Sequence, residues 1–106
     1  MRFLAYDLAL HIIRSLQAPL AIVRRHNAAL AKQGTNVVDS VLLNLAEGNG
    51  RDGGDRLHHF RIALGSLREV GAVLDIATAH GWLEHAPLAP ERDRLCGMIY
   101  GLQRRR

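Results

Sequence analysis

Apolar residues recur at helical spacing in four successive segments of the chain. The pattern predicts helices over residues 3–16, 19–47, 55–80 and 89–103. Pro19 suits the first turn of the second helix, where its missing N–H group costs nothing. Short connections favour antiparallel neighbours. We therefore predict an all-α fold, an antiparallel up-down-up-down four-helix bundle that residues 1–106 form as a single domain.

Glycines mark the region between the second and third predicted helices. Gly34-Thr35-Asn36 is poor helix material, so we expect a kink or a short break within the second helix. Gly48 is suited to cap that helix in the left-handed conformation. Asp52 or Asp55 is expected to cap the next helix at the positive end of its dipole. Gly81 is expected to end the third helix.

Two predicted helices are apolar over more of their circumference than one core requires. Extended apolar faces usually mark an interface, although single apolar residues on a surface are ordinary. Because both helices carry a coherent second stripe, we predict that the chain forms a homo-oligomer. The second stripes consist of Phe3, Tyr6, Leu10 and Ile13 on the first helix and of Ile62, Val73 and Ile76 on the third.

The composition is that of a helical protein with an excess of positive charge. Apolar residues make up 48% of the chain and aromatic residues only 5%, which favours helices. The net charge of +4 favours RNA, DNA or another acidic partner. The basic residues are almost all arginine, which is also what a GC-rich genome encodes, and a solvated face with local ion pairs is the alternative. The arginines considered for phosphate contacts are Arg24, Arg25, Arg51, Arg56, Arg61 and Arg68.

The chain shows no recognisable catalytic, cofactor or metal motif. No two of its six histidines have the i, i+4 spacing of a helical zinc site. The serines lack a nucleophile elbow, and the glycines near Gly48 lack the Gly-Lys-Ser/Thr end of a phosphate-binding loop. Cys96 is more typical of a small core residue than of a nucleophile. We therefore expect a protein without enzymatic activity, cofactor or metal ion.

The sequence also bears on localisation. A single cysteine builds no internal disulfide framework, which favours a reducing cytoplasm. The apolar start of the chain is interrupted by Asp7, His11 and Arg14, and no stretch of 18 apolar residues exists. We therefore expect a cytoplasmic protein without a membrane partner.

One stretch has the character of a family signature. It comprises Asn44-Leu45-Ala46-Glu47-Gly48 and, beyond Arg51, Ile62-Ala63-Leu64-Gly65-Ser66-Leu67 followed by Glu69. With these residues the chain resembles the four-helix-bundle proteins encoded in intervening sequences of 23S ribosomal RNA genes, which are related to the accessory variability determinant proteins of diversity-generating retroelements. The resemblance implies a left-handed antiparallel bundle that assembles as a homopentameric ring with a central channel. In the retroelement branch, the basic ring binds a reverse transcriptase and nucleic acid.

The signature residues themselves, Asn44, Glu47, Gly48, Gly65 and Ser66, have the character of structural residues. We expect the Asn44 amide to satisfy turn carbonyls, and Glu47 to pair with Arg51 or Arg61. Gly65 and Ser66 are small enough to let a neighbouring helix approach. Replacement of Gly65 by leucine is therefore expected to impair folding or assembly.

These observations together predict a non-enzymatic, ring-forming helical bundle that acts as an interaction module. Its expected partners are further copies of itself, with nucleic acid or a reverse transcriptase as candidates. The alternative is a purely structural oligomer that binds no nucleic acid.

Overall fold

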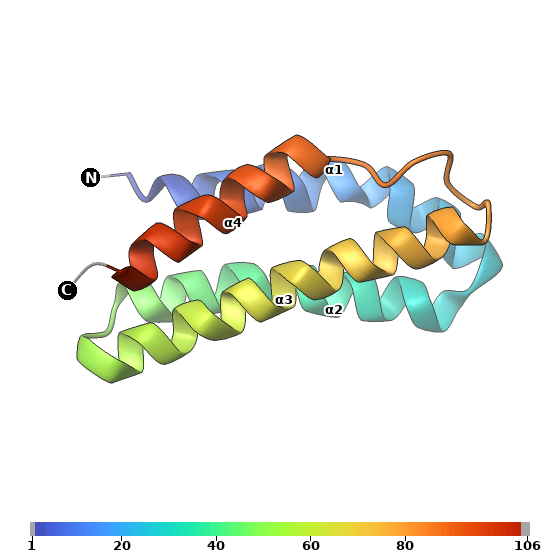
Figure 1. Cartoon of the computed structure of the whole chain (residues 1–106). Coiled ribbons are helices and arrows are strands. Elements are labelled where there is room, and N and C mark those ends of the chain that lie inside the picture. The colour runs from blue at the N-terminus through green and yellow to red at the C-terminus, as the bar shows by residue number, and fades with distance from the viewer. Residues whose placement is uncertain (1, 105–106) are drawn as a thin grey trace.

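Four α-helices follow one another in the computed structural model, which describes residues 2–104. They are α1 (Leu4–His26), α2 (Ala28–Asn49), α3 (Gly53–Ala79) and α4 (Ala89–Arg104). Consecutive helices run in opposite directions (Figure 1). The helix α2 packs most extensively against α3, whereas α4 packs against α3 and only lightly against α1. The predicted all-α four-helix bundle is confirmed, and no strand occurs among the described residues.

The first helix does not end before Pro19. The prediction of separate helices over 3–16 and 19–47 is wrong, because α1 continues through Pro19 for nearly two further turns. A proline inside a helix costs roughly 3 kcal/mol. Full burial of an aliphatic side chain contributes about 1.5–3 kcal/mol, and both Leu20 and Val23 are buried after the proline. Packing of these two side chains offsets the proline.

The break between α1 and α2 lies at Asn27. Its backbone is extended, with φ −153°, and its N–H still donates to the carbonyl of Val23 at 2.8 Å. The Asn27 side-chain oxygen accepts a hydrogen bond from the N–H of Leu30 at 3.0 Å. Asparagine is a preferred N-cap because its side chain satisfies a free N–H of the first turn. A single residue therefore ends one helix and caps the next.

The predicted kink at Gly34-Thr35-Asn36 is absent, and α2 continues unbroken through these residues. Gly34 is buried, and a Cβ atom there would lie 2.9 Å from Leu20 and 3.2 Å from Val73. The glycine therefore allows α1 and α3 to approach α2 closely. Val73 is only 3% exposed, so its assignment to an oligomer interface is wrong.

The turn between α2 and α3 also differs from the prediction. Gly48 does not cap α2 in a left-handed conformation; it is buried within the helix, against the ring of Phe60. A Cβ atom on Gly48 would lie 2.5 Å from that ring. The helix ends at Asn49 with Gly50 as its C-cap, and Gly53 is the residue of this turn with positive φ, +59°. Asp52 occupies the N-cap position of α3, but its side chain makes no capping hydrogen bond.

The far end of α3 is as predicted. Gly81 has φ +78°, and its N–H donates to Thr78 while the N–H of Trp82 donates to Ala77. Trp82 stacks on the rings of His80 and His26, at centroid distances of 4.5 and 5.2 Å. This stacking ties the end of α1 to the connection between α3 and α4.

The core runs along the length of the bundle, which measures 43 × 23 × 20 Å. Its largest fully buried side chains are Phe60, Ile12, Leu16, Leu45, Leu67, Leu74, Leu95 and Ile99, which come from all four helices. No charged or polar side chain is buried among the described residues. Within residues 2–104, no helix combines the length and apolar character that crossing a bilayer requires.

The contact between Gly48 and Phe60 gives a direct test of the packing. Gly48→Ala should destabilise the protein by about 1–3 kcal/mol, because the added methyl group overlaps the Phe60 ring. Gly97→Ala in α4 is the matched control, since nothing lies within 4 Å of a Cβ atom there. It should stabilise by up to about 1 kcal/mol through helix propensity. Urea denaturation measures both, and equal stability of the two variants would contradict the packing described here.

Candidate functional site

Signature residues form a chain of hydrogen bonds along the contact between α2 and α3. The hydroxyl groups of Ser40 and Ser66 lie 2.9 Å apart and join the two helices. The Asn44 amide nitrogen donates to the Ser40 carbonyl at 2.9 Å and to the Ser40 hydroxyl at 3.2 Å. The Asn44 oxygen lies 3.0 Å from Nδ1 of His59. The prediction that Asn44 serves turn carbonyls is wrong, because its partners lie within α2 and on α3.

The hydrogen bonds of Asn44 determine the tautomer of His59. The Ser40 carbonyl can only accept, so the Asn44 atom that faces it is the amide nitrogen. The other Asn44 atom is then an oxygen acceptor, and His59 Nδ1 must donate to it. The neutral His59 ring therefore carries its proton on Nδ1. The second ring nitrogen, Nε2, lies 3.9 Å from Asp55.

An exposed ion-pair cluster continues this chain at the turn. Arg51 contacts Glu47 at 3.2 Å and Asp55 at 3.1 Å, so it bridges the end of α2 and the start of α3. The hydrogen bond that Arg51 donates to Glu47, together with the charge of Asp55, raises the pKa of Arg51 above its ordinary value. The predicted pairing of Glu47 with Arg51 is confirmed. Exposed ion pairs contribute little to stability, so the cluster chiefly orders the turn.

This arrangement fits a structural role better than catalysis. Asn44 separates Ser40 from His59, so no hydroxyl in the cluster has a histidine base beside it. Burial raises the pKa of the Cys96 thiol, which disfavours the reactive thiolate. No group of three potential metal ligands lies together anywhere in residues 2–104. The hydrogen bonds instead hold α2 and α3 in one register.

Sequence reasoning missed Ser40 and His59. A signal for the serine was present, since Ser40 and Asn44 are four residues apart and therefore share a helix face. His59 could be placed only once the alignment of α2 with α3 was known. Gly65 is exposed, and no atom of another helix lies within 4 Å of a Cβ atom built there. Ser66, in contrast, contacts Ser40 within the α2–α3 contact.

The arginines considered for phosphate contacts do not form one patch. Arg24 and Arg25 lie in the last turn of α1, at the opposite end of the bundle from the α2–α3 turn (Figure 1). Arg51 is held between two carboxylates. Arg56 donates to the Gly48 carbonyl and lies 4.6 Å from the centre of the Phe60 ring. Arg24, Arg25, Arg61 and Arg68 are exposed.

The predicted interface residues are also divided. Phe3 and Ile13 pack against the core, and Tyr6 and Leu10 are partly buried. On α3, Ile62 and Ile76 are 37% and 44% exposed, so they remain available to a partner. Sequence reasoning missed Leu43 on α2, which is 64% exposed. Of the large apolar side chains on α2 and α3, these three are therefore the ones most exposed to a partner.

Comparison with known proteins identifies the family of the chain. The family model for the 23S rRNA-intervening sequence protein matches residues 3–101. The chain belongs to the 23S rRNA-intervening sequence protein family. The match includes all of α1, α2 and α3 and most of α4 of this intervening-sequence family protein. No curated protein and no solved structure matched in the corresponding searches.

The hydrogen-bond chain in this 23S rRNA-intervening sequence family protein predicts coupling between Asn44 and His59. Asn44→Ala should destabilise by about 1–3 kcal/mol, because it leaves partly buried groups without partners. In a double-mutant cycle with His59→Ala, the two effects should be non-additive by about 0.5 kcal/mol or more. Arg51→Gln, which removes only exposed ion pairs, should leave the stability nearly unchanged. Denaturation curves measure each term, and strictly additive effects would argue against the hydrogen bond.

Proposed function

We propose that this protein is a non-enzymatic helical bundle that assembles with copies of itself and acts as an interaction module. The observation that carries the proposal is the outer face of α3, which we define as Ile62, Gly65, Glu69, Ala72 and Ile76. All five residues are exposed. Helical periodicity places them on one side of α3, away from the core. The face holds two isoleucines, the small residues Gly65 and Ala72, and the charged Glu69, whose carboxylate accepts a hydrogen bond from Gln33 of α2 at 2.9 Å. The two exposed isoleucines favour a helix of another copy as the covering partner.

Gly65 supports this assignment. A glycine in mid-helix costs about 0.5–1 kcal/mol relative to alanine. Nothing within the chain requires a glycine there, because no atom lies within 4 Å of a Cβ atom at this position. Close approach by a neighbouring copy accounts for the small residue. We therefore expect Gly65→Leu to leave the isolated bundle folded and to obstruct assembly.

Leu43 extends the outer face of α3 onto α2. Ser40 lies beside Ser66, and Asn44 lies beside His59. In two antiparallel helices with this alignment, Leu43 and Ile62 occupy the same level. Together they place apolar side chains on both helices in the half of the bundle nearer the α2–α3 turn. A single surface of this kind also suits a two-fold pair, because a ring needs a second, different surface on each subunit. The family resemblance is what supports a ring of five subunits.

Nucleic acid, or an enzyme that acts on it, is proposed as a further partner. The exposed Arg61 and Arg68 are seven residues apart and share a face of α3, and no carboxylate lies within ion-pair distance of either among residues 2–104. In a ring, these pairs would recur in every subunit. Such a surface suits contacts to phosphates that position a nucleic acid without reading its bases.

Light scattering tests the self-assembly. The protein should have a mass several times the 11.7 kDa of one chain. The double variant Ile62→Glu, Ile76→Glu should shift to the single-chain mass, because buried charges disrupt an apolar interface. Ala18→Glu with Ala29→Glu adds the same charge at exposed alanines of α1 and α2, outside the proposed surface, and should keep the assembled mass. Circular dichroism establishes that both variants fold.

A protein that is monomeric in dilute solution would refute the assembly. An unchanged mass for the Ile62→Glu, Ile76→Glu variant would refute the assigned surface. In either outcome the fold described above stands.

Gel retardation over a salt series tests the nucleic-acid contacts. Binding should weaken steeply with salt, since each phosphate contact releases counterions. Replacing both Arg61 and Arg68 by glutamine should reduce the slope of log K against log salt by about 1–2. Arg51→Gln removes a charge that Glu47 and Asp55 already neutralise, so its effect should be much smaller. Absence of retention at low salt would leave a purely structural oligomer.

A further inference from the structure

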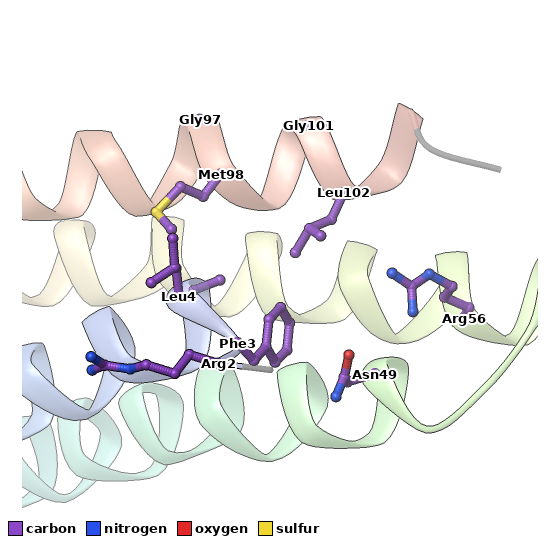
Figure 2. Close-up of a pocket in the computed structure, with 10 residues that line it drawn as sticks. Arg2, Phe3, Leu4, Asn49, Arg56, Gly97, Met98, Gly101 and Leu102 are labelled. Carbon is purple, nitrogen blue, oxygen red and sulfur yellow. The ribbon is translucent and has the colours of Figure 1, made fainter.

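A groove opens at the end of the bundle where the start of α1 meets the end of α4 (Figure 2). Its volume is about 520 Å3, within the range of small-molecule sites. Phe3 and Leu4 line it from the N-terminal side, and Met98 and Leu102 line it from α4. The groove lies on the α1–α4 side, where the two helices pack least extensively. At the same end of the bundle, Asn49 at the end of α2 and Arg56 near the start of α3 complete its lining.

The apolar part of the groove is unfilled. Leu4 is 62% exposed although it belongs to the first turn of α1. Gly97 and Gly101 stand on consecutive turns of α4, and no atom lies within 4 Å of a Cβ atom on either. The intrachain packing therefore gives no reason for glycine at these positions, each of which costs about 0.5–1 kcal/mol in a helix. Their missing side chains leave the groove open along α4.

The groove has one polar end. Figure 2 shows Asn49 and Arg56 together at this end, with Leu4 and Met98 at the other. Arg56 uses one nitrogen, Nη1, on the Gly48 carbonyl at 3.2 Å. No carboxylate lies within 4 Å of its guanidinium among residues 2–104. The guanidinium is thus a half-buried positive charge with donors to spare.

The opposite end of the groove offers no comparable charge. Arg2 also lines it, but its guanidinium is paired with Asp7 at 2.9 Å. A ligand that brings one negative charge is therefore directed to Arg56. The groove therefore has an anion-binding end at Arg56, and the rest of its lining is mainly apolar.

We propose that this groove binds an apolar carboxylic acid, with the carboxylate on Arg56 and Asn49 and the alkyl chain along Phe3, Leu4, Met98 and Leu102. A guanidinium matches a carboxylate in geometry and forms two parallel hydrogen bonds with it. The Asn49 amide makes no hydrogen bond within the described part of the chain and can donate to the same group. The alkyl chain covers Leu4 and occupies the space beside the two glycines. This binding does not depend on the proposed self-assembly.

Titration with decanoate, followed by amide chemical shifts in NMR, tests the site on the full chain. Shifts should concentrate at the start of α1 and the second half of α4. Decanol, which lacks the charge, and acetate, which lacks the chain, should each bind at least about tenfold more weakly. Arg56→Gln should weaken decanoate binding by about tenfold or more, whereas Arg61→Gln, at an exposed arginine elsewhere on α3, should leave it unchanged.

A second variant tests the groove itself. Gly101→Leu should abolish decanoate binding by filling the open space, without disturbing the fold, because Gly101 is exposed and no atom lies within 4 Å of a Cβ atom there. Gly65→Leu is the matched control at an exposed helical glycine outside the groove and should bind decanoate normally, even if it obstructs assembly. Circular dichroism establishes that both variants fold.

Several results would overturn the proposal. Equal binding by the Arg56→Gln variant, or equal binding of decanol, would remove the carboxylate site. Undiminished binding by the Gly101→Leu variant would show that decanoate binds elsewhere. Loss of the assembled mass in Gly101→Leu, with no decanoate binding to the unaltered protein, would show that a second copy covers the groove. This last result leaves self-assembly intact, so the two proposals fail independently.

Discussion

The contact of α2 with α3 depends on the absence of a side chain at Gly48. The Phe60 ring occupies the space where a Cβ atom would lie, which brings the start of α3 directly against the end of α2. Gly34 has the same role in the middle of α2, where it admits Leu20 from α1 and Val73 from α3. Interiors are close-packed, so a methyl group at either position must displace a neighbour. These two glycines therefore place three helices relative to one another.

The polar features of the protein follow from this alignment. Once Phe60 lies on Gly48, His59 is brought beside Asn44, and Ser66 beside Ser40. The same placement brings Arg56 over the Phe60 ring and aims it at the Gly48 carbonyl. The signature residues therefore have two roles in the α2–α3 contact. Gly48 allows the apolar packing inside it, and Asn44 and Ser66 form hydrogen bonds at its edge. These hydrogen bonds of Asn44 and Ser66 hold α2 and α3 together, which is a structural role.

The two surfaces proposed for binding lie on different parts of the bundle. The outer face of α3 runs along one helix, whereas the groove lies at one end of the bundle, between α1 and α4, with Asn49 of α2 and Arg56 of α3 at its polar end. The outer face of α3 presents isoleucines on a continuous helix. The groove between α1 and α4 is open because α4 is the shortest helix and carries glycines on the side towards α1. A protein of this size can therefore engage a further copy at one surface and a small ligand at another.

Local sequence was sufficient for the features that depend on one segment. The helical spacing predicted four helices, α4 begins where expected, and Gly81 ends α3, because periodicity, proline and glycine act within a few residues. Tertiary packing decided the rest. It carried α1 through Pro19, kept Gly48 helical beneath Phe60, buried Val73, and determined which arginines are paired and which are free. The physical reason is that burial and ion pairing are summed over contacts between distant segments, whose alignment no single segment specifies.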